Sequence, residues 1–403
     1  MSPVLPAITK TVNDRRGHGP RHLAFVTSTP LTVAGGSGTY VGIRELAHSL
    51  GDLGVRITTH APGFWSPSFT AKRVLFNLRV ASRLREGPYD WVVGFDLDGF
   101  RYGRAPVLPY VASIKGVIAD ELRNERGLVR LMLAVQASLE QLAVRRADVV
   151  VATSRYSRQR IVEAYGISPG KVVLVPELID LTAWASEQGA RPVPEANPPA
   201  VLTVAHLYPR KNLGTLLKAY VLLAKAGVPF QGWVVGEGPC RRMWERQRDA
   251  LGLQGRVAFL GTVPRRELLD RYRRSGVFCL PSRQEGFGIV FLEAMANAKP
   301  IVAARAAAVP ETVADGEVGL LAGPDDPEEL ARNLSALLTN PELRRAMGQA
   351  GRRRVETYRA DRVAKMFLAR IQAALDGRPE RDAPGDTADV AFRGPEERTG
   401  GPR

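Results

Sequence analysis

Short apolar runs alternate with amphipathic helical patterns along most of the chain. The first alternation joins the run RHLAFVTS at 21–28 to the helical pattern YVGIRELAHSL at 40–50 through a glycine-rich loop. Further apolar runs begin at positions 55, 91, 109, 148 and 171. Several of them are apolar on both faces, as parallel strands buried between helices must be. The pattern predicts a doubly wound α/β domain over residues 21–182.

A second series of alternations follows the polar, proline-rich stretch ASEQGARPVPEANPPA. Apolar runs resume there at positions 200, 231, 257, 277, 300 and 318. Asn212 and Asp326 precede two helical patterns as expected N-caps. We therefore predict a second domain of the same kind over residues 197–357. Residues 377–403 have almost no apolar content, and we expect this tail to be disordered.

Composition agrees with a two-domain globular protein. The 403 residues exceed what one core usually organises, and no apolar run reaches the roughly 20 residues that span a bilayer. The N-terminus lacks the apolar segment of a signal peptide, and two cysteines are too few for a disulfide framework. We expect a cytoplasmic enzyme.

The net charge of +15 adds a further constraint. Residues 1–20 carry +2 and residues 377–403 carry −1, so the excess lies on the folded body. A surplus of this size is typical of proteins that meet an anionic partner, whether nucleic acid, a membrane surface or a charged substrate. The motifs below favour an anionic substrate, and we expect no nucleic-acid partner.

Two glutamates stand in the otherwise apolar segment EGFGIVFLE. The preceding strand-like run ends at Ser282 and a helical pattern begins near Gly288. Glu285 therefore falls on the loop at the carboxyl end of a strand, and Glu293 about 1.4 turns into the helix. Ligands of doubly wound sheets bind at that edge, and a helix N-terminus attracts phosphate. The segment favours a sugar-phosphate cradle; the alternative is that Glu285 only caps the helix and Glu293 only faces solvent.

The segment EGFGIVFLEAMANAKPIVAAR resembles the Glu-x7-Glu motif of the retaining glycosyltransferases of family 4, whose GT-B fold has two facing Rossmann-like domains. The similarity continues through VPETVADGEVGLLAGPDDPEELA and YPRKNLGTLLKAY, and covers residues 21–372 more loosely. It implies a nucleotide-diphosphate sugar as donor, bound by the second domain, and an acceptor bound by the first. It also implies that a helix at about 358–376 crosses back onto the first domain.

The resemblance assigns donor contacts to the cradle. Glu293 would accept hydrogen bonds from the ribose hydroxyls, because a carboxylate can accept two at once. Glu285 would hold the donor sugar hydroxyls or phosphate. The backbone around it would take part, at Gly286, Phe287 and Gly288.

In the stretch VAHLYPRKN the family has an arginine and a lysine that clamp the donor diphosphate. Lys211 matches the lysine, whereas His206 stands at the arginine position and Arg210 lies nearby. Positive charge is needed where the leaving diphosphate develops negative charge. The alternatives are a solvated helix-start lysine and a packed histidine. In the first glycine-rich loop, Gly35 and Gly36 are expected donor contacts, or else part of a plain turn.

The acceptor side is predicted in the first domain. Lys115 stands at or near a place where the family often has a histidine, and Asp120 follows in the same charged loop; a solvated loop is the alternative. The triplet Asp96-Leu97-Asp98 matches the metal motif of the other large glycosyltransferase fold, but we expect Asp98 at the acceptor cleft and no metal. We expect catalytic roles for Lys211, Glu285 and Lys115, and no cofactor.

The stretch TAKRVLFNLRVASRLREG predicts a basic amphipathic helix. Its expected apolar face is formed by Val74, Leu75, Leu78 and Ala81. The basic residues around that face are Lys72, Arg73, Arg79, Arg83 and Arg85. Such a helix can lie on an anionic membrane, so weak peripheral association at the inner face is one expectation. The alternative is that the apolar face packs on the domain's own sheet.

Taken together, these patterns predict a retaining, metal-independent hexosyltransferase acting on a glycan, lipid-linked or small-molecule acceptor. A phosphorylase or synthase of the same architecture is one alternative. A non-catalytic sugar-nucleotide binding protein is another, suggested by His206 and Lys115. A dinucleotide oxidoreductase is disfavoured because no acidic residue suitably follows the first glycine-rich loop as a ribose ligand.

Overall fold

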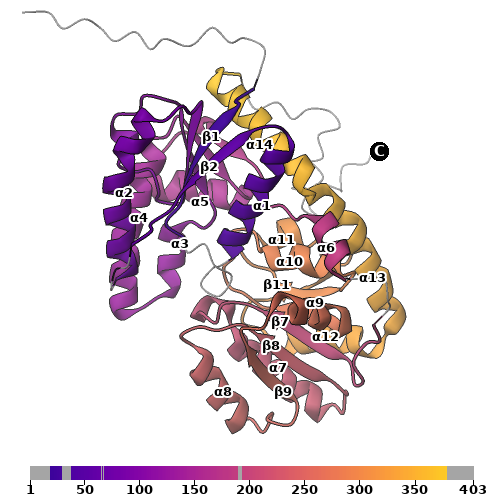
Figure 1. The fold of residues 1–403 in the computed structure, drawn as a ribbon. Coiled ribbons are helices and arrows are strands. Elements are labelled where there is room, and N and C mark those ends of the chain that lie inside the picture. Colours follow the sequence, from indigo (N-terminus) through magenta and orange to yellow (C-terminus); the bar gives the residue numbers. More distant parts are fainter. Residues whose placement is uncertain (1–18, 30–37, 65, 67, 189–192, 379–403) are drawn as a thin grey trace, which may run out of the picture.

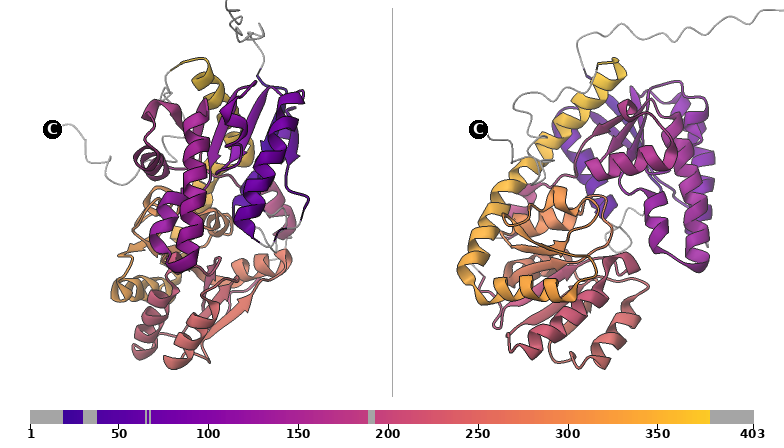
Figure 2. Two further views of the ribbon diagram at one scale, coloured as in Figure 1. Left: turned by 90° about the vertical axis from the view of Figure 1, so that its left-hand side faces the viewer. Right: turned by 180° about the vertical axis from the view of Figure 1, so that it is seen from behind.

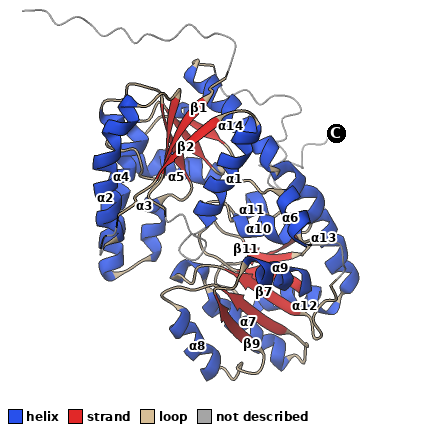
Figure 3. Ribbon diagram, viewed as in Figure 1, coloured by secondary structure: helices blue, strands red, loops and turns tan. Residues whose placement is uncertain are grey.

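Two six-stranded parallel sheets, each covered by helices on both faces, form the two halves of the computed structural model (Figures 1 and 3). The structure describes residues 19–29, 38–64, 66, 68–188 and 193–378. Gly35 and Gly36 and the tail from residue 379 onward lie outside the described residues.

The first sheet has the strand order β2-β1-β3-β4-β5-β6. Its strands are β1 (His22–Val26), β2 (Arg56–His60), β3 (Trp91–Phe95), β4 (Tyr110–Ile114), β5 (Val149–Ala152) and β6 (Val172–Leu174). The helices of this half are α1 (Gly38–Asp52), α2 (Phe69–Glu86), α3 (Ile118–Glu121), α4 (Gly127–Arg146) and α5 (Arg155–Tyr165), and α6 (Leu181–Gln188), which follows them in the chain, packs on α9 (Arg265–Arg274) of the second half. Short 3-10 turns join them: η1 (Tyr102–Arg104), η2 (Leu122–Asn124) and η3 (Pro169–Lys171).

The second sheet has the strand order β12-β11-β10-β7-β8-β9. Its strands are β7 (Ala200–Val204), β8 (Gln231–Val235), β9 (Val257–Gly261), β10 (Ser275–Leu280), β11 (Ile301–Ala304) and β12 (Gly319–Ala322). The helices are α7 (Leu213–Lys225), α8 (Arg241–Ala250), α9 (Arg265–Arg274), α10 (Ile289–Ala296), α11 (Val309–Thr312), α12 (Pro327–Thr339) and α13 (Pro341–Arg354). Two 3-10 turns complete it, η4 (Pro209–Lys211) and η5 (Val355–Tyr358).

The predicted fold class is confirmed, since every apolar run named above forms a strand of a parallel sheet. Of the two predicted N-caps, Asp326 caps α12 by accepting a hydrogen bond from the Glu329 amide at 2.8 Å. Asn212 also occupies the N-cap position, that of α7, but its side chain makes no capping hydrogen bond. Its backbone is left-handed, and its side chain donates to the carbonyl of Pro324 and accepts from the Thr215 hydroxyl instead of capping α7.

The last helix, α14 (Ala360–Leu375), runs from the second half back to the first (Figure 2). It packs against α1, the edge strand β6 and its neighbour β5. Its buried face, which includes Val363 and Phe367, shares an apolar cluster with Leu23 and Ile43. The chain therefore crosses between the two domains twice, and the core of the first domain is completed by the C-terminal helix.

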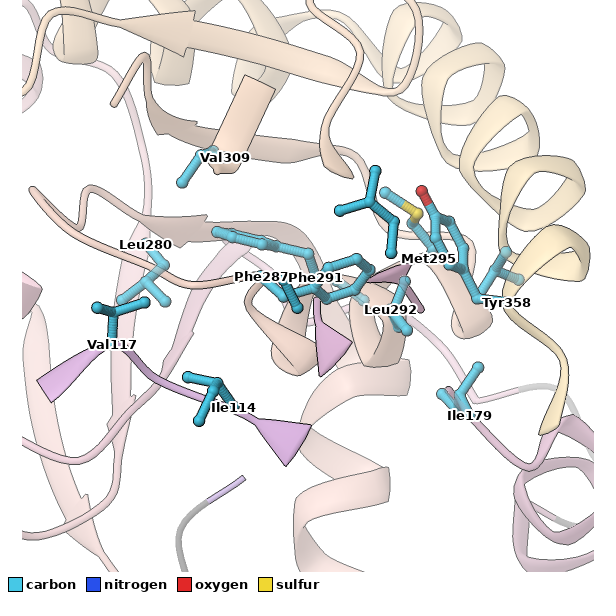
Figure 4. Packing of buried hydrophobic residues seen from close by; sticks show 14 of the residues in the cluster. Ile114, Val117, Ile179, Leu280, Phe287, Phe291, Leu292, Met295, Val309 and Tyr358 are labelled. Carbon is cyan, nitrogen blue, oxygen red and sulfur yellow. The ribbon is translucent and has the colours of Figure 1, made fainter. Parts of the chain in front are cut away.

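The two domains also share an apolar contact at the carboxyl ends of their strands (Figure 4). Ile114 and Val117, at and after the end of β4, belong to one continuous cluster with Leu280 and Phe287 of the second domain. The Phe287 ring meets Tyr358 edge-on at a centroid distance of 5.5 Å. This packing excludes water between the sheet edges from which the candidate site residues project.

Polar contacts between the domains converge on the carbonyl of Gly286. It accepts hydrogen bonds from the hydroxyls of Thr153, Ser154 and Ser157, at 3.2, 2.8 and 3.0 Å. Nearby, the Glu311 carboxylate accepts from the first two amides of α5, at 2.8 and 2.7 Å. These bonds fix the loop after β10 against the start of α5, and with it the glutamate that precedes Gly286.

Candidate active site

The candidate site lies between β7 and β10, where the strand order of the second sheet reverses. The strands that follow β7 in the chain extend the sheet to one side, and those that follow β10 extend it to the other. The loops leaving the two strands diverge at such a point and leave a crevice that binds ligands in doubly wound proteins. η4 carries Lys211 after β7, and the loop after β10 carries Glu285.

Lys211 and Glu285 form a buried ion pair at this point. The Lys211 Nζ donates to Glu285 Oε1 at 2.6 Å, and the two residues are 8% and 6% exposed. Arg210 lies on the other side of the carboxylate, with its guanidinium 3.7 Å from Glu285 Oε2. The sequence pattern predicted all three as donor contacts, and the structure brings them together.

The charges of this cluster are set by burial and by the neighbouring groups. Burial alone would raise the pKa of Glu285, but Lys211 and Arg210 outweigh it and the pKa is lowered. Burial and then the nearby Arg210 guanidinium lower the pKa of Lys211, against the pull of Glu285. Two cations therefore meet at the Glu285 carboxylate, and an anionic ligand at this point would compete with the carboxylate for them.

A second acidic residue ties this cluster to the first domain. The Arg210 guanidinium lies 3.3 Å from the Glu121 carboxylate of α3, across the interdomain gap. Burial would lower the pKa of Arg210, but the carboxylates of Glu121 and Glu285 raise it. Glu121 was not among the site residues predicted from the sequence. Nothing in the sequence shows that α3 faces η4.

Glu293 occupies the second turn of α10 and is buried, with 7% exposure. Its Oε2 accepts a hydrogen bond from the Tyr272 hydroxyl of α9 at 2.8 Å. Burial raises the pKa of this carboxyl, and the bond from Tyr272 acts in the opposite direction. The alternative that Glu293 faces solvent was wrong.

Gly286 and Gly288, the two glycines of the predicted cradle, are each needed for a different structural reason. Gly288 caps α10 in a left-handed conformation with φ 88°, and a Cβ there would lie 2.5 Å from the Phe291 ring. A Cβ at Gly286 would lie 3.0 Å from the carbonyl oxygen of Lys115, so this glycine lets the two domains approach. Phe287 is buried in the shared apolar cluster, and its carbonyl accepts from Thr312.

On the first-domain side, Lys115 follows β4 and pairs with a glutamate that follows β6. The Lys115 Nζ donates to Glu177 Oε2 at 3.0 Å, and both side chains are less than a tenth exposed. The Asp96 carboxylate fixes the Lys115 backbone by accepting from its amide at 2.9 Å. Gly42 on α1 makes room for the pair, since a Cβ there would lie 2.6 Å from Glu177 Oε2. The sequence analysis missed Glu177, although an acid directly after a buried strand at this edge was a usable signal.

Two residues predicted on the acceptor side are engaged elsewhere. Asp98 is fully buried, and its carboxylate accepts hydrogen bonds from Ser28 and from Asn77 Nδ2, which removes it from the cleft. Asp120 is 3% exposed and accepts from the Tyr156 hydroxyl at 2.7 Å and from Arg160 Nε at 3.1 Å. Both carboxylates stabilise the first domain, and their hydrogen-bonding capacity is used within it.

His206 lies in the loop after β7, its ring 6.1 Å from that of Tyr208. Metal binding at Asp96 has no support in the geometry, since Asp98 is committed to Ser28. Within the described parts of the chain, no three His, Cys, Asp or Glu side chains are grouped so that they could hold a metal ion.

Two family models match the chain, one in each domain. A model described as Glycosyltransferase Family 4 matches residues 34–183, and one described as Glycosyl transferases group 1 matches residues 187–354. The fold, the site at the strand ends and both matches define a glycosyltransferase with the GT-B fold. The chain is a glycosyltransferase of the family 4 type.

Curated relatives agree with this family. The GDP-mannose-dependent alpha-(1-6)-phosphatidylinositol monomannoside mannosyltransferase of Mycolicibacterium smegmatis is 29% identical over 77% of this chain and 82% of its own length. The D-inositol 3-phosphate glycosyltransferase of Kineococcus radiotolerans is 32% identical over 59% of this chain and 60% of its own length. The chain thus spans most of the first relative and about three fifths of the second.

Solved structures show the same fold at lower identity. Sucrose-phosphate synthase from Thermosynechococcus elongatus superposes with a TM-score of 0.72 at 20% identity, over 89% of this chain and 100% of that one. Anabaena HepE in complex with UDP and glucose superposes with a TM-score of 0.67 at 18% identity, over 88% of this chain and 100% of that one. Both are similar to this chain across its two domains.

Proposed function

We propose that this glycosyltransferase transfers a hexosyl group from a nucleotide-diphosphate sugar to a hydroxyl acceptor, with retention of configuration and without a metal ion. The observation that carries the proposal is the pair of cations, Lys211 and Arg210, around Glu285 at the strand ends of the second domain. A nucleoside diphosphate gains negative charge as it leaves, and fixed cations in a site with little water stabilise that charge.

The bonding changes follow from a displacement on the front face of the sugar. The acceptor oxygen bonds to the anomeric carbon, the bond from that carbon to the donor phosphate oxygen breaks, and the acceptor proton moves to the departing phosphate. In this mechanism the Lys211 ammonium stabilises the leaving group, Glu285 orients the donor sugar, and Glu293 binds the ribose. Lys115 and Glu177 lie on the acceptor side. The synthase and phosphorylase alternatives share this donor site and differ in the acceptor.

We propose a polyol acceptor, soluble or lipid-linked, because the two curated relatives above are named for phosphatidylinositol monomannoside and D-inositol 3-phosphate. Weak peripheral association with the inner face of a membrane belongs to the same proposal, as does a cytoplasmic location. The ammonium of Lys115 is the group that suits a hydroxyl or an anionic substituent of such an acceptor.

The proposal is tested by screening UDP- and GDP-sugars for thermal stabilisation and for hydrolysis, followed by NMR of the anomeric configuration in the product. We expect stabilisation by at least one donor and a product with the donor's configuration. Stabilisation without turnover on any polyol would favour the non-catalytic sugar-nucleotide binding protein. Absence of both responses with every donor would sink the proposal.

Activity is expected to survive EDTA, because protein cations rather than a metal neutralise the diphosphate. The Asp96→Asn variant is expected to retain donor affinity: the amide oxygen can still accept from the Lys115 backbone, and burial already raises the pKa of the aspartate to about 6. The measurement is turnover with and without chelator, plus calorimetric donor affinity. Loss of turnover in EDTA that Mn²⁺ restores would contradict the metal-free mechanism.

Glu293→Gln is expected to weaken donor binding by about 2 kcal/mol, since the charge-assisted bonds to the ribose become neutral ones. The glutamine oxygen can still accept from Tyr272, so the free energy of unfolding should change little. The control is Tyr272→Phe, which removes the hydrogen bond between Tyr272 and Glu293 but leaves the carboxylate, and it should retain donor affinity. Equal donor affinity for Glu293→Gln and the wild type, measured by calorimetry, would exclude the ribose role.

A further inference from the structure

The outer face of α4 carries a continuous stripe of exposed apolar side chains. Its members recur every three or four residues, so they share one side of the helix. They are Leu128, Leu131, Met132, Val135 and Leu142, which are 68%, 62%, 38%, 47% and 36% exposed. A surface helix normally presents polar residues there, and a contiguous apolar patch marks an interaction site.

The inner face of α4 fixes the helix to the domain. The buried Glu140 carboxylate accepts from the Ile118 amide at 2.9 Å and from the Tyr165 hydroxyl. Within the described ranges, α4 is the helix that is long and apolar enough to cross a membrane, with a mean hydropathy of 1.3. These polar contacts of its inner face would be lost in a bilayer, so α4 can lie on a membrane but cannot span it.

Helix α2 lies beside α4 and carries further exposed apolar side chains. Gln136 of α4 joins the two helices, accepting from Arg73 and donating to the Thr70 hydroxyl, each at 2.9 Å. Figures 1 and 2 show α2 and α4 side by side on the flank of the first domain. The exposed apolar side chains that α2 adds are Phe69, Leu75 and Leu78, at 48%, 42% and 50%. We call the exposed side chains of α2 and α4 together the α2–α4 face.

The α2–α4 face differs from the amphipathic helix predicted from the sequence. Leu75 and Leu78 are exposed, whereas Ala81 packs inside, so the predicted apolar face is divided between solvent and core. Arg73, predicted among the basic residues around that face, is 6% exposed and donates to Ser28 Oγ at 2.8 Å. The apolar surface therefore rests mainly on α4, which the sequence analysis did not single out.

The charged residues around this face indicate which kind of partner it would bind. The basic side chains on and beside the α2–α4 face are Lys72, Arg79, Arg83, Arg123, Arg126 and Arg130. The acidic residues of the same region are Glu125, which stands between Arg123 and Arg126, Glu86, which ends α2, and Glu140, which is buried, so basic side chains prevail. Pairing of two such faces in a dimer would bring like charges together. An anionic surface complements both the apolar stripe and the arginines.

We propose that the α2–α4 face binds the surface of an anionic phospholipid membrane, with the α4 stripe inserted shallowly among the headgroups and the arginines on the lipid phosphates. Both helices begin at the carboxyl ends of their strands, the edge that carries Lys115 and faces the second domain. The membrane would then lie beside the acceptor side of the cleft. The inference rests on the peripheral association in the proposed function and names the surface that would make it, whereas the binding test does not depend on the transfer reaction.

The test is sedimentation of the full chain with vesicles of phosphatidylglycerol and phosphatidylcholine, at low and high salt. We expect binding to the anionic vesicles that weakens with salt. Arg126→Gln together with Arg130→Gln should weaken partitioning about 25-fold, since each basic residue near the surface contributes about fivefold. Leu128→Gln together with Leu131→Gln should abolish insertion, because both side chains are exposed in the free protein and their change leaves the core intact.

Matched controls lie elsewhere on the described surface. Arg332→Gln with Arg345→Gln changes two exposed helical arginines of the second domain, and Val107→Gln changes a 62% exposed apolar residue before β4. Both are expected to bind vesicles as the wild type does.

Equal binding to vesicles of phosphatidylcholine alone, or wild-type binding by the α4 variants, would overturn the proposal. So would a dimer in light scattering that the Leu128 and Leu131 changes dissociate, because the occupant would then be a second copy. Turnover on a soluble acceptor should be the same in all these variants, which separates this test from that of the reaction.

Discussion

Lys211→Met is expected to lower kcat by about 100-fold or more, with a smaller change in the KM of the acceptor. The lysine is placed by η4 at the switch point of the second sheet, and its ammonium is held at 2.6 Å from Glu285. In the proposed reaction this charge matters most as the diphosphate departs, so the loss should appear in turnover. Steady-state kinetics with saturating donor measures it. A change confined to the acceptor KM would show that the cation is misplaced in our mechanism.

The control separates catalysis from folding. Removing Lys211 leaves the buried Glu285 carboxylate with Arg210, 3.7 Å away, as its remaining cation, so a loss in the free energy of unfolding is expected beside the loss in kcat. Lys299 is equally buried in the same domain, at 8% exposure, but its Nζ donates to the carbonyl of Arg273. Lys299→Met also removes a buried ammonium, but one that the proposed reaction does not use, so it should leave kcat unchanged. Thermal unfolding of both variants, measured beside their kinetics, distinguishes the two effects.

The ion pairs around Glu285 also bear on donor binding. The carboxylate is flanked by the Lys211 ammonium and the Arg210 guanidinium, which is itself shared with Glu121 of the first domain. An incoming diphosphate would compete with these carboxylates for the same cations. Binding of the donor would thus weaken a contact that joins the domains, and so couple occupation of the site to the interdomain contact of η4 with α3.

The strands were predictable because their side chains meet helices on both faces. Runs such as WVVGF and VFCL are apolar at successive positions, a pattern that solvent-exposed strands and loops do not show. The location of Glu285 at the edge of the sheet was predictable for the same reason, because Glu285 lies in the loop that follows one of these runs. Asn212 stands at the N-cap position as predicted, but its side chain reaches the Pro324 carbonyl, a partner 112 residues away in the chain.

The residues that the sequence did not reveal depend on contacts between distant segments. Asp98 follows a strand, as a cleft residue should, yet Ser28 and Asn77 surround it and use its carboxylate. Glu177 meets Lys115 only because β4, β5 and β6 are neighbours in the sheet, an order that strand prediction does not provide. The stripe on α4 reads in the sequence like the apolar face of a core helix. Only the packing shows that it points outward.

Lys115→Met is expected to lower the free energy of unfolding by about 3 kcal/mol, because Glu177 would remain buried without its partner. The double variant Lys115→Met with Glu177→Gln removes both charges and should regain most of that stability. Chemical denaturation of the two variants measures the difference. These outcomes follow from the 3.0 Å ion pair and the burial of both side chains alone.

The kinetics of the same variants show whether the Lys115–Glu177 pair takes part in the reaction. The backbone of Lys115 lies against Gly286, the residue after Glu285, so the two ion pairs stand on either side of the domain interface. If the ammonium contacts an acceptor or donor-sugar hydroxyl, the stable double variant should lose about tenfold or more in kcat/KM, the scale of a lost charge-assisted hydrogen bond. Lys115→Arg, which keeps the charge and the bond to Glu177, should restore part of it. Wild-type kcat/KM in the double variant would mean that the pair only holds the ends of β4 and β6 together, and that the acceptor is oriented by other groups of the first domain.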